Sequence, residues 1–146
     1  MDVFATHQTH NETQTLDLAK SLAHILKQDD IIMLNGPLGA GKSVFARGLI
    51  QTLSNTPNED IPSPTFTLVQ QYETSKGLLW HYDLYRLEEA EEIYETGWED
   101  IIYQDIIVIE WAEKLQHLMP HKYINIDIKQ IEENTREITI KKVGSN

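Results

Sequence analysis

One stretch of eight residues, 36–43, constrains the fold of this chain more than any other. It has the sequence Gly-Pro-Leu-Gly-Ala-Gly-Lys-Ser and fits the spacing G-x-x-x-x-G-K-[ST]. The glycines allow the backbone to turn sharply and to point successive N–H groups inward, where they form a cradle for an anion. The pattern therefore predicts a phosphate-binding loop, in which Lys42 reaches the β- and γ-phosphates of a nucleotide and the Ser43 hydroxyl holds Mg²⁺.

The sequence on either side of the loop supports this prediction. Residues 31–34 are apolar, which predicts a short strand buried on both faces. After the loop, Phe45, Leu49 and Leu53 recur every four residues and predict one face of a helix. Strand, glycine loop and helix in this order favour a nucleotide site over the alternative, a glycine-rich turn without a ligand. The residues expected to surround the phosphates are Gly36, Pro37, Leu38, Gly39, Ala40, Gly41, Lys42 and Ser43.

A second apolar run, residues 106–109, ends in the carboxylate of Glu110. Four β-branched residues in succession predict a strand in the middle of a parallel sheet. Ligands of open α/β sheets bind at the carboxyl ends of the strands, so Glu110 is expected to complete an ATPase site. The alternative is an acid that merely follows a core strand. The next residue, Trp111, is expected to pack either beside the nucleotide or against the core.

A polar connection between the two halves of the site contains three of the five prolines of the chain and ends in Ser63-Pro64-Thr65-Phe66. Long connections of this kind are often functional. In a phosphate-loop protein, a hydroxyl group next to the γ-phosphate can act as a switch element. Ser63 and Thr65 fit that role, and they fit local turn hydrogen bonds equally well.

The remaining elements follow from hydrophobic periodicity and from turn residues. After a leader over residues 1–12, ordered in part, helices are expected at 13–26 with Thr13 as N-cap, at 88–95 with Gly97 as the stop, and at 112–119 before Pro120. Strands are expected at 66–72 and 78–82, joined by a loop at 73–77, and at 122–129 and 136–143, which form a C-terminal hairpin. Residues 1–146 are therefore expected to form one domain.

Composition excludes several classes of function. The net charge is −11, with 23 acidic and 12 basic residues, so strong stand-alone binding to nucleic acid is not expected. The chain has no cysteine and no apolar run near the ~20 residues that span a bilayer, and a soluble protein of the cytoplasm is expected. The six histidines do not suggest a metal site. His81, near Asp83, is expected to tune packing or hydrogen bonding.

Four separated motifs resemble, in their order and spacing, the bacterial TsaE family, formerly YjeE. They are the glycine loop at 36–43, Ser-Pro-Thr-Phe at 63–66, His-Tyr-Asp-Leu-Tyr-Arg at 81–86 and Val-Ile-Glu-Trp at 108–111. The resemblance implies an α/β fold, a single-domain P-loop NTPase-like three-layer fold with a mixed parallel and antiparallel sheet. It also implies an ATPase that uses ATP and Mg²⁺, is slow alone and is required for threonylcarbamoyladenosine modification of tRNA. The implied partners are TsaD, which transfers the threonylcarbamoyl group, and TsaB.

The resemblance also implies roles for individual residues. Lys42 matches the phosphate-binding lysine, and Ser43, where the family more often has threonine, matches the residue that holds magnesium. Glu110 matches the acid near magnesium. Asp83 matches an acid that acts through water or metal, with the division of roles between the two acids left open. Thr65 belongs to the switch-like segment.

Two further correspondences, and one residue suggested by the chemistry of phosphoryl transfer, concern the surroundings of the site. Pro37 stands where the family commonly has an acidic residue, which removes a charge without changing the backbone cradle. Glu12 and Thr13 match the region that approaches the base. Arg86 is a candidate for stabilising charge in the transition state, or for holding Asp83 in a salt bridge.

Two other functions compete with this interpretation. A small-molecule kinase would need a lid and several arginines, whereas this chain has three arginines and no spare segment for a lid. A nucleotide-dependent assembly switch would bind nucleotide without productive turnover. A GTPase is disfavoured, because the guanine-reading motif Asn-Lys-x-Asp is absent.

Overall fold

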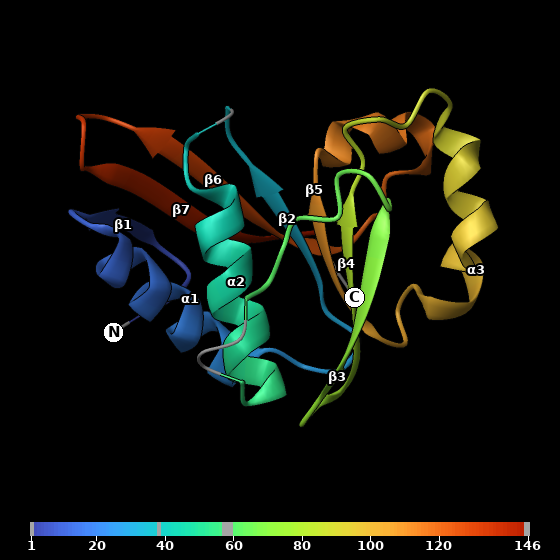
Figure 1. The fold of residues 1–146 in the computed structure, drawn as a ribbon, viewed down its shortest axis with the longest axis horizontal. Helices are drawn as coiled ribbons and strands as arrows, with labels where there is room; N and C mark the ends of the chain where they lie inside the picture. The colour runs from blue at the N-terminus through green and yellow to red at the C-terminus, as the bar shows by residue number, and fades with distance from the viewer. Residues whose placement is uncertain (1, 38, 57–59, 145–146) are drawn as a thin grey trace.

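The computed structural model describes residues 2–37, 39–56 and 60–144. Its centre is a seven-stranded mixed sheet with helices on both faces, in the strand order β1-β7-β6-β2-β5-β4-β3 (Figure 1). The strands are β1 Thr6–Thr9, β2 Ile31–Asn35, β3 Val69–Thr74, β4 Gly77–Asp83, β5 Ile106–Glu110, β6 Tyr123–Gln130 and β7 Arg136–Val143. The helices are α1 Glu12–Ile25, α2 Lys42–Ser54 and α3 Trp98–Ile101, with 3₁₀ helices η1 Ala90–Thr96 and η2 Ala112–Leu118.

The four central strands, β6, β2, β5 and β4, run parallel to one another. Every residue of β5 is buried, as are the first four of β2, which confirms the prediction from their apolar runs. Because the strands are parallel, their carboxyl ends meet at one edge of the sheet. The loop after β2 and the last residues of β4 and β5 all lie at this edge.

Alternate residues of the central strands supply two separate cores. Ile32 and Leu34 belong to the core under α1 and α2, which lie side by side on one face (Figure 1). Ile31 and Met33 belong to the core on the other face, which α3, η1 and η2 cover. This alternation is the period of two that a strand imposes on its side chains. The result is the predicted three-layer α/β fold.

The expected leader contains a strand. Residues of β1 pair antiparallel with β7, with Thr6 opposite Thr139 and Thr9 opposite Arg136. Helix α1 then begins at Glu12, one residue before the expected N-cap. The side chain of Asn11 is the N-cap, since it accepts a hydrogen bond from the Gln14 amide.

The hairpin in the middle of the chain lies further along than predicted. β3 begins at Val69 rather than at residue 66, because the chain turns at Leu68, which has a positive φ of 72°. Phe66 is thus outside the sheet and is 84% exposed. The turn is also tighter than expected, since Thr74 pairs with Gly77 and leaves two residues between the strands.

The last part of the chain follows the predicted order of elements, with one addition, α3, which begins directly after Gly97 and was not predicted. η1 stops at Gly97, whose positive φ of 84° ends the helix, and η2 ends shortly before Pro120. η2 is a 3₁₀ helix broken at Gln116, where the backbone is not helical. β6 and β7 form the predicted antiparallel hairpin. Within the described residues, none of the helices has the length and apolar character needed to cross a membrane.

Candidate functional site

The loop between β2 and α2 adopts a conformation that depends on its glycines. Gly36 and Gly41 have φ of 152° and 114°, values that residues with a side chain rarely adopt. A Cβ atom at Gly36 would also lie 2.6 Å from the carbonyl oxygen of Ile128. Gly41 is the N-cap of α2 and has no side chain with which to cap the first amides of the helix. An anion is the complementary ligand for such an end.

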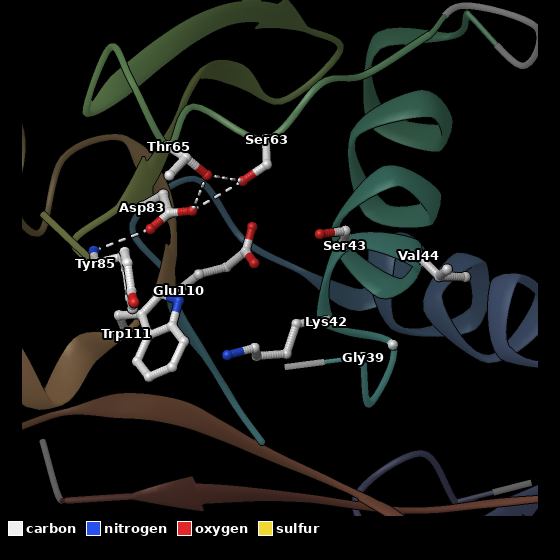
Figure 2. Close-up of a pocket in the computed structure, with 11 residues that line it drawn as sticks. Gly39, Lys42, Ser43, Val44, Ser63, Thr65, Asp83, Tyr85, Glu110 and Trp111 are labelled. Atoms are coloured by element: carbon white, nitrogen blue, oxygen red, sulfur yellow. Dashed lines mark hydrogen bonds between the residues drawn. The ribbon is translucent and has the colours of Figure 1, made fainter. Parts of the chain in front are cut away.

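This loop forms one wall of a cavity of about 440 Å³ at the carboxyl ends of β4 and β5. Figure 2 shows the side chains that converge on it from α2, from the segment before β3, from β4 and from the end of β5. The cavity is lined by Gly39, Gly41, Lys42, Ser43, Val44, Ser63, Thr65, Asp83, Tyr85, Glu110 and Trp111.

Lys42 places a buried cation in this cavity. The residue is only 6% exposed, and its Nζ atom lies 3.8 Å from the centre of the Trp111 ring. The ring of Tyr85 packs against Trp111 in turn, with the ring centres 5.0 Å apart. The ion pairs among the described residues do not include Lys42. Its charge is therefore held by an aromatic face and not neutralised by a carboxylate, as a site for an anion requires.

Asp83 is fixed by three hydrogen bonds. Its Oδ2 atom accepts from the hydroxyls of Ser63 and Thr65, at 2.9 and 2.8 Å, and its Oδ1 atom accepts from the Tyr85 amide at 3.0 Å (Figure 2). Asp83 is 4% exposed. The hydroxyls of Ser63 and Thr65 thus join their loop to the end of β4, beyond the local turn bonds that the sequence also allowed.

Glu110 lies beside Asp83, because the register of β4 and β5 pairs these two residues. Glu110 is 3% exposed, and its Oε2 atom lies 2.8 Å from Nε2 of His81. His81 has the predicted hydrogen-bonding role, but its partner is Glu110. Sequence reasoning missed this pair. The sequence contains one signal for this pair: His81 and Asp83 are two residues apart on one strand and so share a face. Because Glu110 pairs with Asp83, it lies near His81 as well.

The oxygen atoms in the cavity suit a magnesium ion. Ser43, Asp83 and Glu110 all line it, and Mg²⁺ prefers one or two carboxylates together with phosphate oxygens and water. Figure 2 shows the Glu110 carboxylate projecting between Asp83 and Ser43. No group of three or more His, Cys, Asp or Glu side chains in the described ranges could hold a metal alone. A magnesium ion here would therefore take its remaining ligands from a bound phosphate and from water.

Two residues expected near the base lie outside this cavity. Glu12 forms an ion pair with Arg47 and lines a second cavity of about 210 Å³, which shares Gly41 and Val44 with the first. Thr13 is exposed and is not among the residues lining either cavity.

Three described residues of the glycine loop, Gly36, Pro37 and Ala40, are not among those that line the main cavity. Gly36 and Pro37 face a separate cavity of about 390 Å³ beside β6. Ala40 is buried, and its carbonyl oxygen accepts a hydrogen bond of 2.8 Å from Nε of Arg136. Leu38 lies outside the described residues. Lys42, Ser43 and the amides around Gly39 and Gly41 therefore form the part of the loop that faces the site.

Arg86 does not hold Asp83, as one reading of the sequence allowed. The ion pairs of the described residues do not include these two side chains, and both Asp83 oxygens accept from other donors. The Arg86 guanidinium lies 4.5 Å from the centre of the Phe66 ring instead, and Arg86 is not among the residues that line the cavity. The guanidinium thus contacts an exposed aromatic ring outside the cavity.

A glycine loop between a buried strand and a helix, with acids at the ends of two neighbouring parallel strands, defines a protein with a P-loop NTPase-like fold. Comparison with known proteins identifies one family within this class. The chain belongs to the TsaE family, because the model of the family described as "Threonylcarbamoyl adenosine biosynthesis protein TsaE" matches residues 9–138.

Similar proteins agree with this assignment. A Rickettsia felis protein named "tRNA threonylcarbamoyladenosine biosynthesis protein TsaE" is 46% identical over 90% of this chain and 76% of its own length. A Bacillus subtilis protein of the same name is 34% identical over 94% of this chain and 85% of its own length. The crystal structure of Bacillus subtilis YdiB superposes with a TM-score of 0.75 at 28% identity, covering 97% of this chain and 86% of that one.

Proposed function

We propose that this protein binds ATP with Mg²⁺, hydrolyses it, and is required for threonylcarbamoyladenosine biosynthesis in tRNA. The observation that carries the proposal is the meeting of Lys42, Ser43, Asp83 and Glu110 in one cavity, in a chain of the TsaE family. The related proteins are named for this biosynthesis, and we extend that role to this chain. The partners in the proposal are TsaD and TsaB, and the compartment is the cytoplasm.

The chemistry of phosphoryl transfer to water requires positioning and neutralisation of charge. In the proposed reaction, Lys42 and the loop amides bind the β- and γ-phosphates. Ser43 and Glu110 would hold the magnesium ion, which when bound supplies further positive charge at the phosphate oxygens. Asp83 orients the attacking water, and its bonds to Ser63 and Thr65 keep it in place.

Calorimetry with purified protein, ATP and Mg²⁺ tests the proposal directly. We expect binding by the wild-type protein, and loss of that binding in Lys42→Ala, because the substitution removes the buried cation from the cavity. We expect Glu110→Ala to bind ATP but to hydrolyse it at least 10²-fold more slowly, in the range that positioned catalytic groups contribute. Absence of ATP binding by the wild-type protein, with and without TsaD and TsaB, would refute the proposal.

A further experiment separates this function from its two competitors. ATP consumption is measured with and without small-molecule acceptors, since a kinase would need an acceptor for turnover. Cells carrying Lys42→Ala or Glu110→Ala are assayed for modified tRNA and for assembly of the partner complex. We expect assembly to persist while modification is lost. Loss of assembly in Lys42→Ala together with normal modification in Glu110→Ala would favour an assembly switch without productive turnover, and normal modification in either variant would contradict the role assigned to that residue.

A further inference from the structure

A buried histidine lies behind the cavity and does not line it. His81 is on β4 and is 2% exposed, and it contacts Glu110 through Nε2 at 2.8 Å. In the sheet register His81 stands opposite Val108, two residues before Glu110, so its ring reaches diagonally toward the end of β5. A substrate in the cavity would meet Glu110, with His81 on the far side of that carboxylate.

The direction of the hydrogen bond follows from the chemistry of the two groups. An ionised carboxylate only accepts hydrogen bonds, so Nε2 of His81 carries the proton and donates it to Oε2 of Glu110. The other ring nitrogen, Nδ1, is buried and has no hydrogen-bond partner among the described residues. The bond to Glu110 is thus the polar contact that sets the orientation of the ring.

A purely structural role explains this histidine poorly. A buried polar atom without a partner costs free energy, and an apolar side chain of similar size at position 81 would avoid the cost at Nδ1. What the imidazole adds is a donor for Glu110, a carboxylate almost fully removed from water. Oε2 is engaged by His81, and Oε1 accepts nothing from this donor and is available to a ligand in the cavity.

We propose that His81 is a positioning residue for Glu110. By donating from Nε2 to Oε2, it holds the carboxylate in the rotamer that projects into the cavity, where Glu110 would ligate the magnesium ion. This inference rests on the proposed function and extends that function, because it assigns a role to a residue that would touch neither nucleotide nor metal. Ligating carboxylates commonly depend on such hydrogen-bonded partners.

The test compares two substitutions of His81 that differ in their ability to donate a hydrogen bond to Glu110. Gln at position 81 can place an amide N–H near the position of Nε2, whereas Leu fills the space without a donor. We expect His81→Leu to lower kcat for ATP hydrolysis by roughly 10- to 100-fold with little change in KM for ATP. We expect His81→Gln to recover most of kcat. His117→Leu is the matched control, since His117 forms an exposed pair with Glu91 of the same length, 2.8 Å, outside the cavity.

A second measurement does not depend on turnover. Nitrogen-15 NMR of the ligand-free protein should show a His81 ring that carries a proton on Nε2, and Glu110→Gln should shift this signal. Wild-type kcat in His81→Leu would overturn the inference, and so would an equal loss in the Gln and Leu variants. If the wild-type protein neither binds nor hydrolyses ATP, the proposed function fails and this role of His81 fails with it. The NMR signal then shows whether the bond itself exists.

Discussion

At the scale of single residues, the site combines one cation with aromatic neighbours. Lys42 lies over Trp111, and the ring of Tyr85 packs against Trp111. Trp111 has a positive φ of 63°, which is unusual for an aromatic residue, and it follows directly after the strand that ends in Glu110. The strained backbone turns the indole toward the cavity, where a ligand would alter its contact with Lys42.

This contact gives an optical test of ligand binding. A phosphate bound to Lys42 changes the environment of the Trp111 ring, so addition of ATP and Mg²⁺ is expected to change tryptophan fluorescence. Trp80 and Trp98 do not line the cavity and should contribute little to the change. Titration of Trp111→Phe is the control. A change of the same size in this variant would show that the signal comes from elsewhere.

Tyr82 provides a test of stability against pH. Burial raises the pKa of the Tyr82 hydroxyl above its ordinary value of 10.0, and the hydrogen bond with Thr96 opposes this more weakly. In the unfolded chain the hydroxyl loses its proton near 10.0, while the folded protein keeps it to higher pH. The contribution of Tyr82 is therefore complete below 10.0 and is lost as pH rises through its raised pKa.

Urea denaturation at a series of pH values around and above the ordinary pKa of tyrosine measures this effect. The free energy of unfolding of the wild-type protein is expected to fall more steeply with rising pH than that of Tyr82→Phe. Contributions from the rest of the chain are common to both proteins and cancel in the difference between the two curves. Parallel curves for the two proteins would show that Tyr82 does not contribute.

At the scale of elements, the junction between α1 and the middle hairpin depends on one lysine. Lys76 lies in the turn between β3 and β4, and its Nζ atom donates to the carbonyl oxygens of Ala23, His24 and Leu26. These carbonyls are at the C-terminal end of α1, where the last carbonyls of a helix lack the usual i+4 amide donors, although the Leu26 amide also donates to Ala23. The ammonium group also interacts favourably with the negative end of the helix dipole.

Lys76→Met is expected to lower the free energy of unfolding by about 1–3 kcal/mol, because three carbonyls lose a charged donor. Lys20→Met, at an exposed position on the same helix, is the control and should change stability by less than about 0.5 kcal/mol. Both values come from urea denaturation. Equal effects of the two substitutions would show that the bonds of Lys76 to the end of α1 do not contribute to stability.

At the scale of the whole molecule, the site draws on segments that lie far apart in the sequence. The glycine loop, the segment that carries Ser63 and Thr65, and the ends of β4 and β5 all line one cavity. A ligand that binds there contacts only the folded protein, since the unfolded chain does not bring these segments together. Binding and folding are therefore linked.

This linkage predicts that ATP and Mg²⁺ stabilise the entire fold. At a concentration of 100 times Kd, the free energy of unfolding should rise by about 2.7 kcal/mol, which corresponds to an increase in Tm of roughly 5–10 °C. Differential scanning fluorimetry measures the shift. Removal of Mg²⁺ by a chelator should reduce it, and Lys42→Ala should abolish it. An equal shift in the Lys42→Ala protein would place the nucleotide in a different site.

Local patterns in the sequence were sufficient for the elements that lie nearest the site. The glycine spacing predicted the loop at 36–43, and uninterrupted apolar runs predicted β2 and β5, because strands buried on both faces need no alternation. Periodicity likewise predicted α2 and the C-terminal hairpin. The first strand of the middle hairpin begins at Val69 and not at residue 66 as predicted, because the turn at Leu68 overrides the β-propensity of residues 66–68.

Contacts between distant segments could be decided only by the tertiary structure. The pairing of β1 with β7 joins the two ends of the chain, and the bond of His81 to Glu110 depends on the register of two strands. The sequence by itself determined which residues form the phosphate loop and the buried strands, since hydrophobic period and glycine spacing are local properties. The sheet order determined which acids and hydroxyls face one another, because that geometry arises only when the strands pack together.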